Sequence, residues 1–317
     1  MRDRDARPPG AGPGRRVQHV PGEQTRQDRG DGPVVEQAHA KLNLTLEVLG
    51  KRQDGYHDLA SVMQTVELHD DVAVEDAARV EVICDDPALL GEANLGYRAA
   101  ESLRSKAGVR RGARITVTKR IPLAAGLGGG SADAAATLRA LNRLWDLGLS
   151  LEELSGLGAA VGSDVPFLVH EGTALVRGRG EQVTLLPPAS LDWLIVLCPV
   201  IQLDGKTGRL FSQVTPDMYT LGDLSHKLAG RIRGGGDVPA ELMFNVFDRL
   251  APKVFPGWTM YRDALTSLGA REVILAGAGP SMFAKAPRKE LGTAWQLLLE
   301  KQRGWRVFLT RPWQPAR

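Results

Sequence analysis

The stretch from Pro122 to Ala136, PLAAGLGGGSADAAA, decides the fold of this chain. Its glycines lie between Gly126 and Gly130, and glycine allows positive φ angles and a close approach of the backbone to a ligand. Ser131 and Asp133 suit the first turn of a helix, and an apolar stripe at helical spacing follows, formed by Ala134, Leu138, Leu141 and Trp145. A glycine-rich loop that runs into a helix N-terminus favours phosphate, and the alternative is a tight turn before an ordinary helix.

This loop differs from the two commonest phosphate-binding loops. No Lys-Ser/Thr pair follows the glycines, which excludes a Walker A loop, and the G-x-G-x-x-G opening of a dinucleotide-binding fold is missing. The loop resembles the P-x-x-x-G-L-G-x-S-S/A-A loop of the GHMP kinase superfamily, which includes galactokinase, homoserine kinase and mevalonate kinase. The resemblance implies an ATP site formed by Pro122, Leu123, Ala124, Ala125, Gly126, Leu127, Gly128, Gly129, Gly130, Ser131 and Ala132.

The composition is that of an ordinary globular protein. Of its residues, 43% are hydrophobic and 24% are charged. A length of 317 residues is enough for two domains with sizeable cores. No apolar stretch approaches the roughly 20 residues of a membrane span. The net charge of +3 gives no reason to expect a nucleic-acid partner. Cys84 and Cys198 lie far apart without metal-ligand spacing, so we expect free thiols in the cytoplasm.

Residues 1–33 are expected to be a disordered tail. They are rich in glycine and proline, alternate arginines with acids and contain few large apolar residues, so that burial cannot offset the entropy of ordering. Neither a signal peptide nor a transit peptide fits this composition. An upstream extension or a misplaced start codon would explain the tail, since folded-looking sequence begins near Val34.

Two short segments near residue 50 carry candidate binding residues. Polar and apolar residues alternate from Lys41 to Glu47, which predicts a half-buried strand with its leucines toward the core and its polar residues on the other face. From this pattern alone, the Lys41 side chain is expected to be exposed to solvent. A turn at Asp54-Gly55 precedes Tyr56 and His57, which could stack on a base and hydrogen-bond to its edge.

The segments AKLNL (residues 40–44) and GYH (residues 55–57), taken with the glycine loop, resemble the family of 4-diphosphocytidyl-2-C-methyl-D-erythritol kinases of the non-mevalonate isoprenoid pathway. The resemblance implies that Lys41 is catalytic with Asn43 beside it. It further implies that Tyr56 stacks on cytosine and that His57 hydrogen-bonds to it. The family usually has proline before Ala-Lys, where this chain has His39.

A carboxylate follows Gly162-Ser163, at the predicted mouth of a short apolar strand. Asp164 in this setting can project into a cleft or form an Asx-turn. The family resemblance makes it the general base for the hydroxyl at position 2 of the methylerythritol, with Lys41 favouring the charged carboxylate and stabilising the transferring phosphoryl group. It also implies Mg²⁺ between the β- and γ-phosphates, with Ser131 as a candidate ligand. Gly172–Glu181 predicts a glycine-rich hairpin at the rim.

The second half contains weaker motifs. Residues 205–211 resemble the family's T-K-T-A-x-x-Y/F segment, with a departure at Asp204-Gly205, and imply that Phe211 flanks cytosine opposite Tyr56. Residues 221–240 are expected to form a mobile loop, and residues 244–248 to be structural. Residues 277–283 resemble the third superfamily motif, a glycine turn between a strand and a helix, in which Gly277 and Gly279 would close the substrate pocket.

Together these features predict an α+β, two-domain GHMP kinase fold. An ATP-binding domain like a ribosomal-protein domain would span residues 34–187, and a ferredoxin-like α/β sandwich residues 188–317. The predicted enzyme uses ATP and Mg²⁺ to phosphorylate the cytidyl substrate, as a monomer or homodimer. Two alternatives remain: a homoserine- or mevalonate-type kinase, which would lack the Tyr56-His57 pair, and a non-catalytic binding protein, which would be expected to have lost Lys41 or Asp164.

Overall fold

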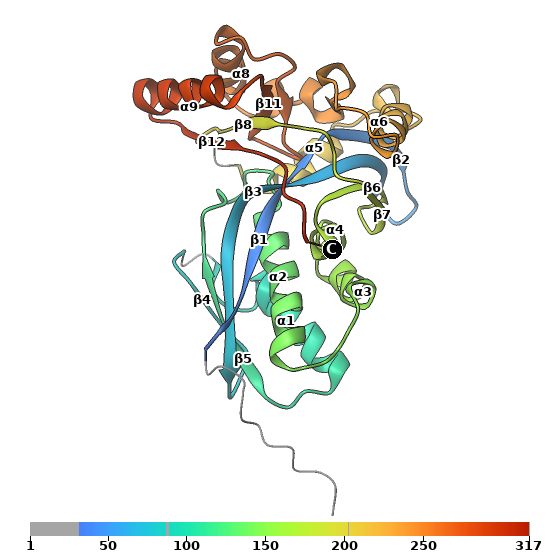
Figure 1. Ribbon diagram of the computed structural model, residues 1–317. Coiled ribbons are helices and arrows are strands. Elements are labelled where there is room, and N and C mark those ends of the chain that lie inside the picture. The colour runs from blue at the N-terminus through green and yellow to red at the C-terminus, as the bar shows by residue number, and fades with distance from the viewer. Residues whose placement is uncertain (1–31, 87–88, 202, 317) are drawn as a thin grey trace, which may run out of the picture. The chain divides into compact units, whose positions relative to one another are not determined.

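The long strand β3 organises the first of two sheets. The computed structural model describes residues 32–86, 89–201 and 203–316, so the predicted tail lies outside the described residues except for Gly32 and Pro33. The first half of β3 pairs with β2 on one edge and β6 on the other, and its second half pairs with β1 and β5 (Figure 1). The strands of this sheet are β1 (Val34–Asn43), β2 (Thr45–Lys51), β3 (His57–Ala77), β4 (Glu81–Cys84), β5 (Gly112–Thr118), β6 (Thr173–Gly178), β7 (Gln182–Leu186) and β9 (Phe244–Asn245).

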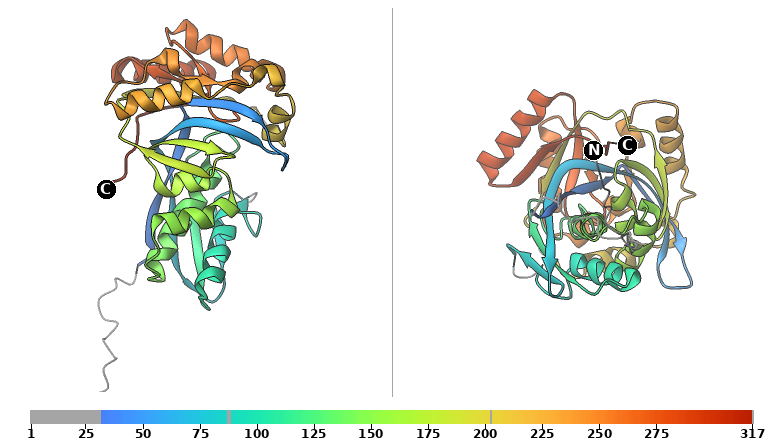
Figure 2. Two further views of the ribbon diagram at one scale, coloured as in Figure 1. Left: turned by 90° about the vertical axis from the view of Figure 1, so that its right-hand side faces the viewer. Right: turned by 60° about the horizontal axis from the view of Figure 1, so that its bottom comes forward.

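Helices cover one face of this sheet, and the sheet curves around α2 (Figure 2). The apolar stripe predicted for α2 is confirmed, because Ala134, Leu138, Leu141 and Trp145 are buried. Asn94 caps α1 by accepting a hydrogen bond from the amide of Gly96, and Ser150 and Glu153 form a capping box at α3. These helices are α1 (Leu95–Ala107), α2 (Gly129–Leu144), α3 (Leu151–Val161) and α4 (Val165–His170).

The second sheet is antiparallel, in the order β10-β11-β8-β12. Side chains of β8 alternate between two cores: Leu194 and Val196 join the core of the first sheet, whereas Ile195 and Leu197 pack with α8 and α9. This strand is therefore buried on both faces, as its continuous apolar run predicts. The sheet consists of β8 (Trp193–Cys198), β10 (Ile274–Leu275), β11 (Met282–Ala286) and β12 (Arg306–Thr310), and the helices nearby are α5 (Lys206–Ser212), α6 (Asp223–Arg233), α7 (Ala251–Val254), α8 (Trp258–Ser267) and α9 (Lys289–Arg303).

The structure corrects the expectations for residues 221–240 and for residues 41–47. Residues 221–240 do not form a loop throughout, because α6 occupies residues 223–233 and buries Ser225, Leu228, Ala229 and Ile232. These residues recur at helical spacing, but the glycines at 234–236 that follow them favour the prediction of a loop. In addition, the segment from Lys41 to Glu47 is not half-buried. It is divided between the end of β1 and the start of β2, and its polar residues Lys41, Asn43, Thr45 and Glu47 are all buried because protein covers both faces of these strands.

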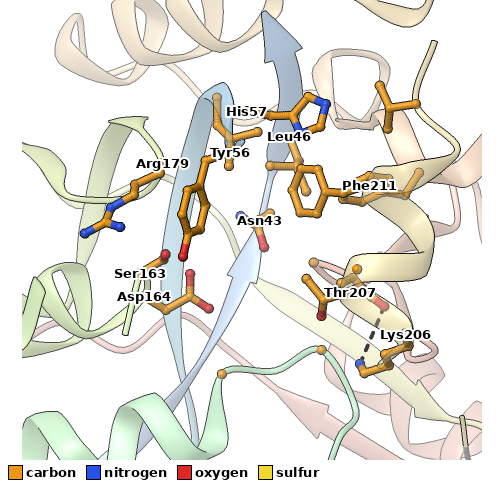
Figure 3. A pocket seen from close by; sticks show the side chains of 18 of the residues that line it. Asn43, Leu46, Tyr56, His57, Ser163, Asp164, Arg179, Lys206, Thr207 and Phe211 are labelled. Carbon is orange, nitrogen blue, oxygen red and sulfur yellow. Dashed lines mark hydrogen bonds between the residues drawn. The ribbon is translucent and has the colours of Figure 1, made fainter. Parts of the chain in front are cut away.

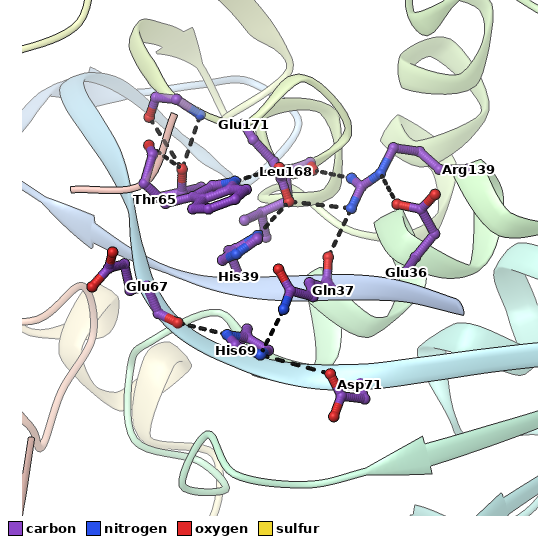
Figure 4. A network of polar contacts seen from close by, with 12 residues as sticks. Glu36, Gln37, His39, Thr65, Glu67, His69, Asp71, Arg139, Leu168 and Glu171 are labelled. Carbon is purple, nitrogen blue, oxygen red and sulfur yellow. Dashed lines mark hydrogen bonds and ion pairs between the residues drawn. The ribbon is translucent and has the colours of Figure 1, made fainter. Parts of the chain in front are cut away.

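The C-terminal segment returns to the first sheet. The amide of Trp313 donates to the carbonyl of Thr65 over 2.8 Å, and its indole stacks on His39 with ring centroids 4.2 Å apart. His39 and the indole N–H of Trp313 both hydrogen-bond to the carboxylate of Glu171, which also pairs with Arg139 (Figure 4). His39 is thus part of a contact between β1 and the end of the chain. No helix among the described residues is long and apolar enough to cross a bilayer.

Candidate active site

A cavity of about 670 Å³ brings together segments from most of the chain (Figure 3). The predicted site residues that line it are Lys41, Asn43, Tyr56, His57, Gly126, Gly128, Ser131, Asp164, Phe211 and Gly277. The remaining predicted residues do not line this cavity: Pro122, Leu123, Ala124, Ala125, Leu127, Gly129, Gly130, Ala132 and Gly279. Among these, Ala125, Leu127 and Ala132 are buried and hold the loop against the core.

Lys41 is fixed at both ends. Its backbone amide donates to the carbonyl of Leu127 over 2.9 Å, which joins β1 to the glycine loop. Its Nζ donates to Oδ1 of Asn43 over 2.7 Å and lies 3.5 Å from Oδ2 of Asp164. Asn43 in turn donates to Oγ of Ser61 over 2.8 Å. The ammonium group is therefore buried, hydrogen-bonded and next to one carboxylate.

Asp164 precedes a helix rather than the predicted strand. Pro166 lies in the first turn of α4, where its missing N–H costs nothing, and the following residues are buried on all sides. A short apolar run of this kind cannot be assigned from periodicity alone. The Asp164 side chain remains 29% exposed, compared with 6% for Lys41, so its carboxylate is accessible from the cavity.

The glycine loop needs glycine because other backbone lies against it. A Cβ on Gly126 would lie 2.1 Å from the carbonyl oxygen of Ala276, and one on Gly128 would lie 2.8 Å from Cγ of Lys41. The amide of Ser281 also donates to the carbonyl of Ala125 over 3.2 Å. The turn at Gly277–Gly279 therefore packs on the loop. It joins strands β10 and β11, and the expectation of a strand followed by a helix is wrong there.

Asp133 does not belong to the first turn of α2, because the helix begins at Gly129 and places it one turn further along. Its carboxylate is buried and pairs with Lys119 over 2.6 Å, and Lys119 pairs equally closely with Asp70. Asp70 accepts hydrogen bonds from the amides of Arg120 and Ile121. This buried cluster fixes the backbone that leads into the loop. Burial raises the pKa of Asp133 to about 7.

Aromatic side chains line the other end of the cavity. His57 stacks on Phe211 with ring centroids 5.1 Å apart, and Phe211 meets Phe247 edge-on. Tyr56 is 51% exposed, with the guanidinium of Arg179 lying 5.2 Å from its ring centroid. Tyr56 and Phe211 stand on opposite sides of the cavity in Figure 3. Burial, with the charge of Lys51, lowers the pKa of His57, so its neutral ring has one donor and one acceptor at pH 7.

Several lining residues are not among those predicted from the sequence, including Lys51, Ser163, Arg179, Lys206 and Thr207. Arg179 belongs to the hairpin of β6 and β7, which confirms the predicted glycine-rich hairpin. Lys206 and Thr207 belong to the segment recognised through Phe211. The signal in the sequence was that Arg179 lies in the predicted hairpin and that Lys206 and Thr207 lie in the segment around Phe211. Residue type alone does not identify any of the three as a site residue.

Comparison with known proteins agrees with this arrangement. A family model described as the GHMP kinases N terminal domain matches residues 94–172, which include the glycine loop and Asp164. The 4-diphosphocytidyl-2-C-methyl-D-erythritol kinase of Dehalococcoides mccartyi is 41% identical over 255 residues, covering 80% of this chain and 89% of that protein. The enzyme of the same name from Symbiobacterium thermophilum is 42% identical over 259 residues, covering 81% and 92%.

Solved structures show the same fold. A crystal structure of 4-(cytidine 5'-diphospho)-2C-methyl-D-erythritol kinase superposes with a TM-score of 0.73 at 31% identity, covering 89% of this chain and all of that one. Homoserine kinase from Cytophaga hutchinsonii superposes with a TM-score of 0.69 at 18% identity, covering 92% of this chain and 97% of that one. The second likeness supports the fold alone. The α+β, two-domain GHMP kinase fold predicted from the sequence is confirmed.

Proposed function

Because the chain belongs to the 4-diphosphocytidyl-2-C-methyl-D-erythritol kinase family of ATP-dependent GHMP kinases, we propose that it phosphorylates the 2-hydroxyl group of 4-diphosphocytidyl-2-C-methyl-D-erythritol. One observation carries the proposal. A Lys41–Asp164 pair and the aromatic side chains Tyr56 and Phe211 line the same cavity, so a single ligand can reach both. The domain limits proposed for this fold, 34–187 and 188–317, divide the chain between β7 and β8.

Asp164 acts as the general base in the proposed mechanism. Its partly exposed carboxylate accepts the proton of the 2-hydroxyl group as the oxygen attacks the γ-phosphorus of ATP, and the bond from this phosphorus to the β-phosphate oxygen breaks to release ADP. Lys41 stabilises negative charge on the transferring group, and Asn43 holds Lys41 in position by accepting its hydrogen bond. Phosphoryl transfer requires mainly in-line positioning and charge stabilisation, which rigid, buried groups supply well.

The glycine loop and the start of α2 would hold the phosphates of ATP. Gly126, Gly128 and Ser131 line the cavity, and the backbone amides at the start of a helix favour anions. Ser131 and Asp164 offer hard oxygen donors, which are the ligands that Mg²⁺ prefers. Among the described residues, no three His, Cys, Asp or Glu side chains lie close enough together to hold a metal by themselves. Magnesium would therefore be held mainly by the phosphates, with Ser131 at its side, and would neutralise their charge.

The cytosine ring would lie between Tyr56 and Phe211. Both rings line the cavity, and the neutral imidazole of His57 stacks on Phe211 with nitrogen atoms able to donate and accept. Aromatic stacking holds a base, and hydrogen bonds to its edge select among bases. Homoserine and mevalonate have no base, so they would leave these three side chains unused.

The test is a coupled ADP-release assay on purified protein with ATP, magnesium and the cytidyl substrate, beside homoserine and mevalonate. Asp164→Asn is compared with Asp192→Asn, which changes an exposed carboxylate away from the cavity. We expect turnover of the cytidyl substrate alone, lost in Asp164→Asn and kept in Asp192→Asn. Turnover of homoserine or mevalonate would reject the cytidine site, and ATP binding without any turnover would indicate a binding protein.

A further inference from the structure

Lys206 is a cation of the cavity that the proposed mechanism does not use. It is the first residue of α5, and its Nζ donates to the carbonyl of Gly279 and lies 3.5 Å from the carbonyl of Ala278 (Figure 3). The side chain therefore reaches from the helix that carries Phe211 to the turn that packs on the glycine loop. Its neighbours are neutral carbonyl groups, and within the described part of the chain no carboxylate forms an ion pair with it.

The charges of the cavity are unbalanced. Four of its lining residues are cationic, namely Lys41, Lys51, Arg179 and Lys206, whereas Asp164 is the one carboxylate among the described lining residues. Asp164 lies beside Lys41. Burial, together with the charge of Lys41, lowers the pKa of Lys206 to about 8. Both effects disfavour a charged ammonium, and a bound anion would offset them.

Lys206 is linked through its neighbours to both ends of the proposed substrate site. Phe211, the proposed cytosine platform, is on the same short helix, while the turn that Lys206 contacts reaches Lys41 through Gly277. In the cytidyl substrate, a diphosphate joins the cytidine to the methylerythritol. A ligand with its base at Phe211 and its hydroxyl group at Asp164 must place this diphosphate between them.

We propose that Lys206 binds the diphosphate of the cytidyl substrate and so selects a nucleoside diphosphate over an uncharged nucleoside. The inference rests on the proposed function, because it takes Phe211 as the cytosine site. It assigns Lys206 to substrate binding and leaves the γ-phosphoryl group to Lys41. Lys206 exchanges its carbonyl partners for phosphate oxygens, and charge-assisted hydrogen bonds of this kind are stronger than those to neutral acceptors.

The test compares the binding of cytidine 5'-diphosphate and of cytidine by calorimetry at pH 7. We expect Lys206→Met to weaken the diphosphate about 10- to 100-fold and to leave cytidine unchanged, and Lys206→Arg to keep most of the affinity. Lys285→Met is the matched control. The Nζ of Lys285 likewise donates to a backbone carbonyl, that of Val238, but Lys285 does not line the cavity.

Two results would overturn this inference and leave the proposed function unaffected. Equal weakening of both ligands in Lys206→Met would show that Lys206 only braces α5, and unchanged affinity for both would show that it does not contact the diphosphate. Thermal melting of each variant separates these results from unfolding, and Lys206→Arg repeats the test if the methionine variant does not fold. A wild-type protein that binds neither ligand would reject the cytidine site, and this inference with it.

Discussion

Gly277 lies so close to Lys41 that a Cβ added to the glycine would be 2.7 Å from Nζ of the lysine and 2.8 Å from the carbonyl of Gly126. Gly277→Ala should therefore displace Lys41 or the loop. Because small misplacements of catalytic groups cost large factors in rate, we expect kcat to fall about 10- to 100-fold. Steady-state kinetics with the cytidyl substrate measure this loss.

Gly304→Ala is the control for backbone strain. Gly304 has φ +66° and Gly277 has φ +54°, but a Cβ at residue 304 would meet no atom within 4 Å. Both alanine variants should lose about 1 kcal/mol of stability from the left-handed conformation. Only Gly277→Ala should lose activity, and equal kcat values in the two variants would contradict the close contact as the cause.

Tyr56 provides the cleaner test of base stacking. Phe211 also packs on Phe247, so its removal disturbs the core, whereas Tyr56 is 51% exposed. Tyr56→Ala should weaken cytidine binding about 5- to 150-fold, because a base–aromatic stack contributes about 1–3 kcal/mol. Tyr56→Phe, which keeps the ring, should bind nearly as well as the wild type. Calorimetry measures both, and equal losses in the two variants would exclude stacking.

The sequence predicts the parts of this site that depend on local backbone chemistry. The glycine loop could be located because only glycine tolerates the approach of Ala276 to Gly126, and the caps of α1 and α3 because their side chains satisfy nearby amides. Other features of the site depend on long-range contacts and could not be predicted. Burial of Lys41 on a covered strand, and the packing of Lys206 on the turn at Gly279, depend on segments far apart in the chain.

The same limit applies to Asp133 and to the strand expected after Asp164. Asp133 suits the first turn of a helix by residue type, but the helix begins earlier, and its carboxylate pairs with Lys119, which follows β5 on the other side of the glycine loop. The residues after Asp164 are apolar on every side, so that no periodicity distinguishes a helix from a strand. In both cases tertiary packing decided what local preference could not.

The raised pKa of Asp133 predicts how stability changes with pH. Between about pH 4 and pH 7 the folded state retains a proton that the unfolded state has lost, so this residue lowers the free energy of unfolding as pH rises. The asparagine in Asp133→Asn does not ionise, so the free energy of unfolding of this variant does not decrease in this way. Its stability relative to wild type should therefore increase from pH 5 to pH 8, by about 1–4 kcal/mol at 1.36 kcal/mol per pKa unit.

Urea unfolding at pH 5 and pH 8 measures this difference. Asparagine keeps the size of the side chain and can still accept a hydrogen bond from Lys119, so packing changes little. Asp192→Asn controls for the loss of one negative charge at an exposed position. Parallel pH profiles for Asp133→Asn and wild type would contradict a folded-state pKa near 7.

Trp313 makes two contacts that can be removed one at a time. Its ring stacks on His39, and its Nε1 donates to Oε2 of Glu171 over 3.1 Å. Trp313→Phe removes the hydrogen bond but keeps a ring, and should cost about 0.5–1.5 kcal/mol because Glu171 retains His39 and Arg139. Trp313→Ala removes both contacts from a part-buried site and should cost about 2–3 kcal/mol. Urea denaturation measures the free energy of unfolding of the two variants, and we expect the larger loss for Trp313→Ala. Equal losses would mean that the hydrogen bond, and not the stacked ring, holds the C-terminal segment on β1.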